Sequence, residues 1–199
     1  MRREPGRGRY DRETIDAILD EALYCHLGFV VDGQPYVVPT LHARVGDLLY
    51  VHGSSASRML RHAASGAPMC ATVTLLDGLV LAKSVFNHSL NYRSVIVLGD
   101  ATKLADDDKL DTLRIFTERV APGRWEEARQ PTATELKATT ILSLPLTEAS
   151  AKVRTGPPEE DPEDVDLPVW SGVVPIHLAA EPSEYDWRRV LDGRLGPPR

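Results

Sequence analysis

The stretch that decides the fold is LGFVVDGQPYVVPTLHARV, residues 27–45. Its apolar first part ends at Asp32-Gly33, a pair typical of tight hairpin turns, and an alternating run follows from Pro35 to Val45. This pattern predicts two antiparallel strands. Because Pro39 has no backbone N–H to donate, it predicts a sheet edge or a bulge in the second strand. Such a break leaves backbone groups free to meet a ligand.

More strands than helices are expected on either side of this hairpin. The other predicted strands are 48–52, 69–76, 79–85, 94–104 and 139–146, with a turn at Asp77-Gly78. Apolar residues at helical spacing or helix-start signals predict helices at 14–22, 57–62, 106–116 and 132–138. Short strands with tight turns and few helices predict a mainly β, α+β chain, an antiparallel barrel or sandwich with helical additions.

The chain divides into a central domain and two terminal segments. Residues 1–12 are predicted to form a mobile N-terminal arm, 13–180 the domain, and 181–199 a C-terminal extension. Within the domain, residues 155–168 form an acidic, proline-rich excursion, a composition that favours solvated, extended chain. The apolar segment 170–176 then predicts a return to the body of the domain.

Composition excludes several classes of partner. The 199 residues include 23 Lys and Arg against 29 Asp and Glu, so the net charge of −6 gives no general field for nucleic acid or an anionic membrane. No apolar stretch is long enough to span a membrane and no leader-like segment is found, so we expect a cytoplasmic protein. Cys25 and Cys70 are far apart and the six histidines lack metal-ligand spacing, so no metal site is predicted.

The join between a predicted strand and a predicted helix at residues 50–58 is the most informative local feature. It reads YVHGSSASR, so a loop of small residues meets a helix start that carries several hydroxyls and one arginine. Free N–H groups at a helix start, together with Arg58, predict a seat for a single phosphate. The alternative is that one serine only caps the helix while Arg58 is solvated. A P-loop is excluded, because its glycine and lysine spacing is absent.

Residues 83–94, KSVFNHSLNYRS, form a second polar cluster between two apolar strands. The cluster predicts a binding rim in which Arg93 supplies charge and His88 or Tyr92 a donor, with Ser84 as a further candidate contact. The alternative is a polar loop with asparagine turns. Trp170 follows the acidic excursion, where it could close over a pocket or a partner subunit.

Several motifs, taken in order, resemble the flavin-nucleotide-binding branch of the pyridoxamine 5′-phosphate oxidase-like superfamily, near the 5-nitroimidazole-resistance proteins. The matching segments are GQPYVVP at 33–39, LYVHGS at 49–54 followed by Ser57-Arg58, NYRSV at 91–95, GDA at 99–101, KVRTGP at 152–157 and LPVWSGVVP at 167–175. The resemblance covers about residues 12–178. It implies an antiparallel split β-barrel with peripheral helices that binds FMN at a homodimer interface, with both subunits lining each site.

Carried onto this sequence, the resemblance assigns contacts with the isoalloxazine edge to residues 38–41. It assigns phosphate binding to Ser57 and Arg58 and places His52 beside the flavin. Met59 stands where the true oxidases carry a lysine, so Arg93 is a candidate to compensate. The candidate flavin-binding residues are therefore Val38, Pro39, Thr40, Leu41, His52, Ser57, Arg58, Ser84, Arg93 and Trp170. The roles of Lys152 and Arg154 stay open.

Functions from more than one class fit these residues. The first is an FMN-dependent oxidoreductase in which reduced flavin passes hydride or electrons to a small acceptor. The second is a flavin- or haem-binding module without turnover, with His52 as the candidate axial ligand of haem. The third is a deazaflavin-dependent split barrel, or one that has lost its cofactor. The sequence shows no nucleophile or acid–base constellation that would favour other chemistry.

Overall fold

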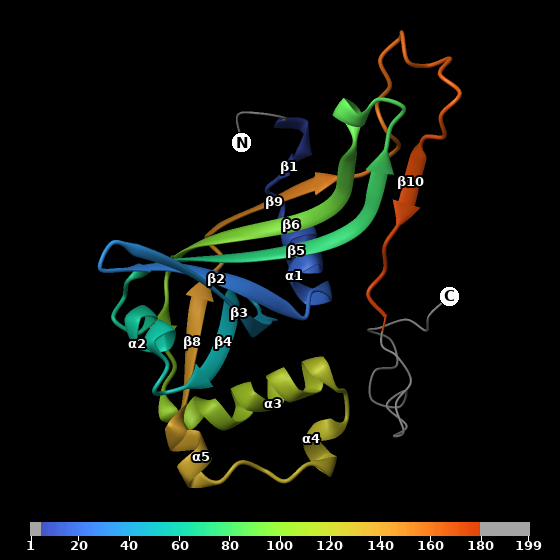
Figure 1. Cartoon of the computed structure of the whole chain (residues 1–199). Coiled ribbons are helices and arrows are strands. Elements are labelled where there is room, and N and C mark those ends of the chain that lie inside the picture. Colours follow the sequence, from blue (N-terminus) through green and yellow to red (C-terminus); the bar gives the residue numbers. More distant parts are fainter. Residues whose placement is uncertain (1–4, 180–199) are drawn as a thin grey trace.

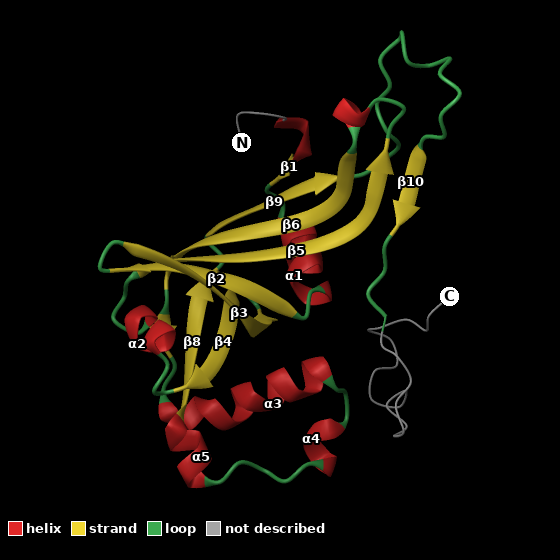
Figure 2. Cartoon of the chain, in the orientation of Figure 1, coloured by secondary structure: helices red, strands yellow, loops and turns green. Residues whose placement is uncertain are grey.

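The computed structural model describes residues 5–179, so the predicted C-terminal extension at 181–199 lies outside the described residues. Antiparallel strands dominate the chain and helices lie at their margins (Figures 1 and 2). This arrangement confirms the predicted mainly β fold. None of the helices between residues 5 and 179 is both long enough and apolar enough to cross a membrane.

Ten strands within residues 5–179 form one antiparallel sheet, in the order β1-β9-β6-β5-β2-β3-β4-β8-β7, and β10 pairs with β5. They are β1 (Gly8–Arg9), β2 (Tyr24–Val31), β3 (Gln34–Val45), β4 (Leu48–Ser54), β5 (Pro68–Leu81), β6 (Ser89–Asp100), β7 (Thr102–Lys103), β8 (Thr139–Pro145), β9 (Glu148–Arg154) and β10 (Gly172–Pro175). The sheet curls on itself, because a Cβ added to Gly99 of β6 would lie 3.6 Å from a methyl carbon of Leu144 in β8. The described strands include no β6–β8 pairing, so the barrel is split there.

Short helices lie at the margins of the barrel. They are α1 (Arg12–Glu21), α2 (Arg58–Ala63), α3 (Lys109–Val120), α4 (Arg124–Glu127) and α5 (Ala133–Ala138), with 3₁₀ turns η1 (Pro5–Arg7), η2 (Val85–Asn87) and η3 (Asp106–Asp108). Capping explains two of the helix starts: the Asp11 carboxylate accepts from the Thr14 N–H at 2.8 Å, and Thr132 with Glu135 forms a capping box. Figure 2 shows α3, α4 and α5 grouped at the end of β4 and β8, away from β5 and β6.

The hairpin of β2 and β3 confirms the predicted strand pair. Asp32 and Gly33 form its turn with φ angles of 51° and 78°, the left-handed conformation that such a turn requires. β2 pairs with residues 34–41 of β3, whereas β4 pairs with residues 42–45. Pro39 therefore lies in a half of β3 that has a strand on one side, and the predicted sheet edge is confirmed.

The predicted turn at Asp77-Gly78 is wrong. β5 runs through this pair as one continuous strand, and its register with β6 shifts there. The pair therefore forms a β-bulge, which bends a strand without ending it. A side chain at Gly78 would clash, because an added Cβ would lie 2.8 Å from a methyl carbon of Val173 in β10. Residues 172–175 pair with β5, so the predicted return of the chain to the domain is confirmed.

The N-terminal segment is paired rather than free within residues 5–12. Gly8 and Arg9 pair with β9, and α1 begins at Arg12. Arg12 also forms an ion pair of 3.0 Å with Asp47, in the turn between β3 and β4. The structure therefore gives backbone pairing to part of the segment that we predicted as a mobile arm, and its mobility stays a prediction. A two-residue strand of glycine and arginine carries no hydrophobic pattern from which it could have been predicted.

Helix α1 packs its apolar face against the core of the barrel. Its Ile15, Ile18 and Leu19 are at most 2% exposed and belong to the main hydrophobic cluster. The strands contribute Leu27, Leu49, Val51, Val73, Val95, Val97, Leu142 and Leu144 to the same cluster. Since full burial of such a side chain contributes roughly 1.5–3 kcal/mol, the packing of α1 is a principal term in the stability of the barrel.

A buried polar junction ties α1, β3 and α3 together. His42 is 1% exposed, and its Nε2–H donates to the carbonyl of Leu19 at 2.8 Å, which assigns the hydrogen to that nitrogen. Arg119 Nη2 donates to the carbonyls of Leu19 and Ala22 at 2.5 and 2.6 Å. These carbonyls lie at the C-terminal end of α1, where a cation is favourable. Burial lowers the pKa of His42 to about 4, so its imidazole is neutral at pH 7.

This neutral histidine predicts a pH-dependent stability. The unfolded chain binds a proton at His42 near pH 6.5 and the folded chain near pH 4, so stability is lost as the pH falls between these values. The loss is about 3 kcal/mol at most. Urea unfolding at several pH values should show it, and His42→Gln, which keeps a donor for Leu19, should flatten the dependence. An equal slope in both proteins would contradict the assignment.

Candidate functional site

Residues 38–41, which we predicted to contact the isoalloxazine ring, lie in the part of β3 that pairs only with β2. Val38 and Thr40 are half-buried, and Val38 packs on the main hydrophobic cluster. Leu41 points to the other side and is 40% exposed. β2 occupies one flank of this segment, and no strand in the described chain occupies the other. Backbone groups on that open flank are available to a planar ligand that lies along the edge.

The loop before α2 differs from the predicted phosphate seat. The N–H groups of residues 55–57 all have acceptors within the chain: the Ala138 carbonyl at 2.8 Å, the Ser54 hydroxyl at 3.2 Å and the Ser54 carbonyl at 2.9 Å. Ser57 caps α2, because its hydroxyl accepts from the Leu60 N–H at 3.5 Å. The N–H groups of the loop that precedes the helix are therefore engaged within the chain. The availability of the N–H groups at the helix start itself, from Arg58 onward, stays a prediction.

Arg58 is the side chain that connects this loop to β3. Its guanidinium carbon lies 4.3 Å from the centre of the Tyr36 ring, and that ring stacks on Phe29 at 5.4 Å. Tyr36 precedes Val38 by two residues, so both side chains lie on the same face of β3. Arg58 is exposed and forms no ion pair with any residue in 5–179. The fold thus brings an available cation next to the open edge of β3.

His52 lies in β4 and faces α3. Its ring centre is 4.3 Å from that of Phe116, and its Nδ1 is buried without a hydrogen-bond partner in the described structure. Burial lowers the pKa of this imidazole, so His52 is neutral at pH 7. The contact that the structure gives this residue is therefore the aromatic side chain of α3.

Arg93 is not available to supply charge to a ligand. It donates to Asp77 at 3.0 and 2.7 Å and also binds the Glu21 carboxylate. The hydrogen bonds to Glu21 and Asp77 raise the pKa of Arg93 further above its ordinary value. The prediction that Arg93 compensates for Met59 is therefore contradicted by these two ion pairs.

Ser84 and Trp170 lie far from α2. Ser84 caps η2, its hydroxyl accepting from the Phe86 N–H at 3.3 Å. Trp170 is 64% exposed and lies directly before β10. Figure 1 places η2 and β10 at the end of the molecule opposite α2. Within one chain, the structure therefore does not bring Ser84 or Trp170 together with Arg58.

The acidic excursion is anchored to the connection between β5 and β6. The Glu160 carboxylate accepts from the Lys83 N–H at 3.1 and 3.2 Å, and the Lys83 ammonium donates to the Val165 carbonyl. Asn87 donates to Asp161 at 3.0 Å. Some of the acidic residues from which we predicted a solvated segment thus bind the neighbouring loop. The paired residues are more than 70 positions apart in the sequence, so local composition does not reveal these contacts.

Lys152 and Arg154 lie in β9. The sequence analysis left their roles open. The Lys152 ammonium lies 5.7 Å from the centre of the Tyr92 ring. Arg154 is buried and donates to the Asn91 side chain at 2.7 Å, while Asn91 donates to the Gly156 carbonyl at 3.0 Å. These contacts join β6, β9 and the start of the excursion, which is a structural role. Within residues 5–179, no three His, Cys, Asp or Glu side chains are grouped as a metal ion would require.

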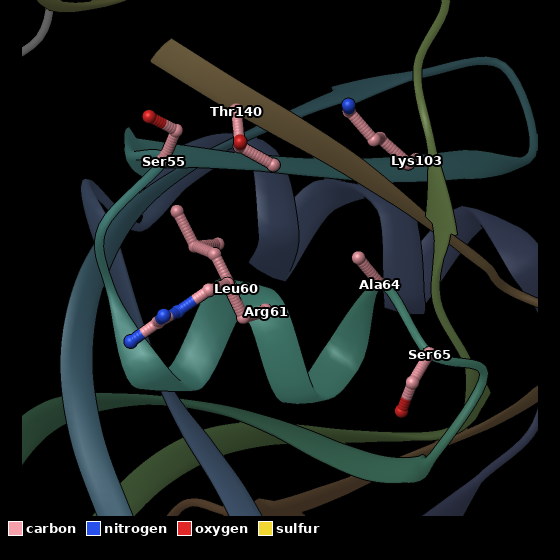
Figure 3. A pocket seen from close by; sticks show the side chains of 7 residues that line it. All are labelled: Ser55, Leu60, Arg61, Ala64, Ser65, Lys103 and Thr140. Atoms are coloured by element: carbon pink, nitrogen blue, oxygen red, sulfur yellow. The ribbon is translucent and has the colours of Figure 1, made fainter. Parts of the chain in front are cut away.

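A pocket of 340 Å³ beside α2 was not predicted from the sequence. The residues that line it are Ser55, Leu60, Arg61, Ala64, Ser65, Lys103 and Thr140. Figure 3 shows Arg61 and Lys103 extending from opposite sides of it, from α2 and β7. These residues come from three separate parts of the chain, so no local motif unites them.

The fold defines the class of the protein: an antiparallel split β-barrel with an inserted N-terminal helix and peripheral helices. The chain belongs to the pyridoxamine 5′-phosphate oxidase family, whose model matches residues 11–153. No curated protein matches the sequence.

Two solved structures are similar over nearly the whole chain. The flavocytochrome Anf3 from Azotobacter vinelandii is 43% identical, with a TM-score of 0.91, and the alignment covers 98% of this chain and 96% of that one. The FAD and haem binding protein from Mycobacterium smegmatis is 38% identical, with a TM-score of 0.86 and coverage of 96% and 94%. A Bacteroides thetaiotaomicron structure assigned to 5-nitroimidazole antibiotic resistance is 21% identical over 73% of this chain and 86% of its own, with a TM-score of 0.59, which shows a shared fold.

Proposed function

We propose that this protein binds a flavin along the open edge of β3, and that Arg58 holds the flavin phosphate. The observation that carries the proposal is the position of Arg58, stacked on Tyr36 beside the unpaired flank of residues 38–41. The two structures at 43% and 38% identity are described as a flavocytochrome and as an FAD and haem binding protein, which supports the same class of ligand.

The residues of this chain would bind and orient the ligand. Backbone groups of residues 38–41 would bind the polar edge of the ring system, and Arg58 would neutralise phosphate charge through charge-assisted hydrogen bonds. A bound flavin supplies hydride or electron transfer, so the function that we propose is oxidoreduction with a small electron acceptor or donor in the cytoplasm. No general acid or base from the protein is needed for that exchange.

The proposal covers both common flavin nucleotides. The sequence resemblance implies FMN, whereas one similar structure is described as binding FAD. FMN and FAD share the isoalloxazine ring, the ribityl chain and the first phosphate, so the contacts at residues 38–41 and Arg58 serve either. Purified protein should therefore be yellow and release FMN or FAD on denaturation.

Substitution Arg58→Ala tests the phosphate contact. We expect it to weaken flavin binding by about 1.5–3 kcal/mol, because one charge-assisted hydrogen-bonding side chain is lost. Quenching of flavin fluorescence measures the dissociation constant. The control is Arg124→Ala on α4, which removes the same charge from an exposed site. An unchanged dissociation constant in Arg58→Ala would rule out this seat, and a protein that binds neither flavin would favour a deazaflavin or no cofactor.

We also propose that the protein is a homodimer. The face of the sheet opposite α1 carries exposed apolar side chains that include Tyr24, Val30, Leu76, Ile96 and Leu98. The pairings of His26 with Thr72 and of Thr72 with Ile96 place Ile96 on the same face of the sheet as His26 of β2 and Thr72 of β5. No described helix of this chain packs on that face, and apolar patches of this kind mark interfaces. A second copy would offer the same face about a two-fold axis.

Substitution Ile96→Asp tests the dimer. A carboxylate on this face costs little in a monomer, where Ile96 is 43% exposed, but would be buried and unpaired in the interface. Light scattering should give about twice 21.9 kDa for the native protein and a monomer for the variant, with flavin affinity reduced at the same time. Leu110→Asp on α3, at a residue of similar exposure, should remain dimeric. A native monomer that binds flavin at full affinity would refute the shared site.

Haem binding is the second candidate function. It is favoured by the similar structures, of which one is described as a flavocytochrome and one as binding haem. A neutral imidazole is the form that binds iron, and burial keeps His52 in that form. Its ring is in contact with Phe116, so iron binding at His52 would require Phe116 and helix α3 to move away from the imidazole. His26, which the sequence analysis did not select, is exposed on the proposed dimer face.

Absorbance spectroscopy tests haem binding directly. A haem protein shows a Soret band as isolated or after haem is added, and substitution of the axial histidine shifts or abolishes it. If His52 is the ligand, His52→Ala loses the band and His26→Ala keeps it. Retention of an unaltered band in His52→Ala would exclude His52, and the absence of any band in haem-loaded native protein would exclude the function.

A further inference from the structure

We propose that the pocket beside α2 binds the adenylate half of a flavin dinucleotide, so that the ligand of this protein is FAD. This inference rests on the proposed flavin site and adds the nucleotide that occupies it. The pocket volume of 340 Å³ falls in the range of small-ligand sites, roughly 300–1,000 Å³. The pocket is too large for one phosphate alone.

The charge of the pocket favours an anion. Arg61 and Lys103 line it, and no carboxylate is among its lining residues. Neither cation forms an ion pair with a residue in the described chain. The nearby Asp106 is engaged by Lys109, at 2.8 Å. Two available cations in one hollow stand out in a protein with a net charge of −6.

The polar groups of the pocket are held in place by the fold. Ser55 is fixed because its N–H donates to the Ala138 carbonyl at 2.8 Å, just before β8 begins. Thr140 is 8% exposed and pairs with Gly53 in β4. Lys103 belongs to β7, which pairs with β8. The hydroxyls of Ser55 and Thr140 thus lie on the strand side, opposite Arg61 on α2 (Figure 3).

The pocket adjoins the proposed phosphate contact. Arg61 follows Arg58 by one helical turn, and its N–H donates to the Ser57 carbonyl at 3.0 Å. Ser55 precedes Ser57 by two residues in the same loop. If the first phosphate of a ligand binds Arg58, the part of the ligand beyond that phosphate would therefore lie beside Ser55 and Arg61. In FAD that continuation is a second phosphate followed by adenosine, whereas FMN ends at the first phosphate.

The test compares FMN and FAD binding to the native protein and to Arg61→Gln and Lys103→Met. We expect FAD affinity to fall about tenfold in each variant, the effect of losing one charge-assisted phosphate contact, and FMN affinity to stay within about twofold. Both residues are exposed at the pocket, so each variant should fold. Arg124→Gln on α4 is the matched control and should leave both affinities unchanged.

Each contrary result overturns a different statement. Equal losses for FMN and FAD would show that the two cations act on the shared first phosphate, and unchanged FAD affinity would show that the pocket is not used. Native protein that binds FMN but not FAD would refute the inference and leave the flavin site intact. Native protein that binds neither nucleotide would refute the flavin site as well.

Discussion

The constraint on which the rest of the structure depends is the change of partners along β3. Up to Leu41 the strand is paired with β2, and from His42 onward it is paired with β4 instead. This exchange of partners carries the barrel from one group of strands to the other, and the flank of residues 34–41 opposite β2 is left as an edge. Proline is compatible with this edge because it has no N–H for a second neighbour to use. The same strand therefore closes the barrel and provides its open flank.

Ion pairing determines which cations of the protein are available to a ligand. Arg93 forms ion pairs with Asp77 and Glu21, and Arg44 forms one with Asp20. These pairs hold α1 and the β5 bulge against the sheet. Within the described chain, Arg58, Arg61 and Lys103 form no such pairs, and the first two lie on α2. Arg58, on the same helix as Arg61, lies over the ring of Tyr36 in the half of β3 that pairs only with β2.

Local sequence patterns correctly predicted those strands and helices whose ends are determined by residues within the same segment. The hairpin at Asp32-Gly33 and the helix after Ser57 are specified by their own turn and cap residues, and both were found. The Asp77-Gly78 pair carries the same turn signal as Asp32-Gly33, yet it forms a bulge. The difference arises from β6, which pairs with β5 on both sides of the bulge, and from β10, which pairs with residues 78–81 beyond it. A pattern read from one segment contains no information about these neighbours.

The same distinction applies to the site. Arg58 could be selected from its loop, but its stacking on Tyr36 depends on the packing of α2 beside β3. Arg93 is an equally suitable residue type for binding a phosphate, but carboxylates 16 and 72 positions away in the sequence bind its guanidinium. The pocket beside α2 combines residues of α2, β7 and β8, which only the barrel brings together.

The remaining sequence candidates lie at the other end of the molecule, and the second subunit that we propose would give them a physical role. The ends of β5 and β6, together with β10 and the anchored acidic excursion, form an arm (Figure 1). Ser84 caps η2 on this arm, and Trp170 lies two residues before β10. Val85 and Phe86 on this arm are 83% and 90% exposed, an unfavourable position for apolar side chains in a monomer. The arm lies at the margin of the same strands whose outer face is apolar. In the two-fold dimer that we propose, we expect each arm to reach the partner's barrel, so that Ser84 and Trp170 would complete the site to which the partner's Arg58 belongs.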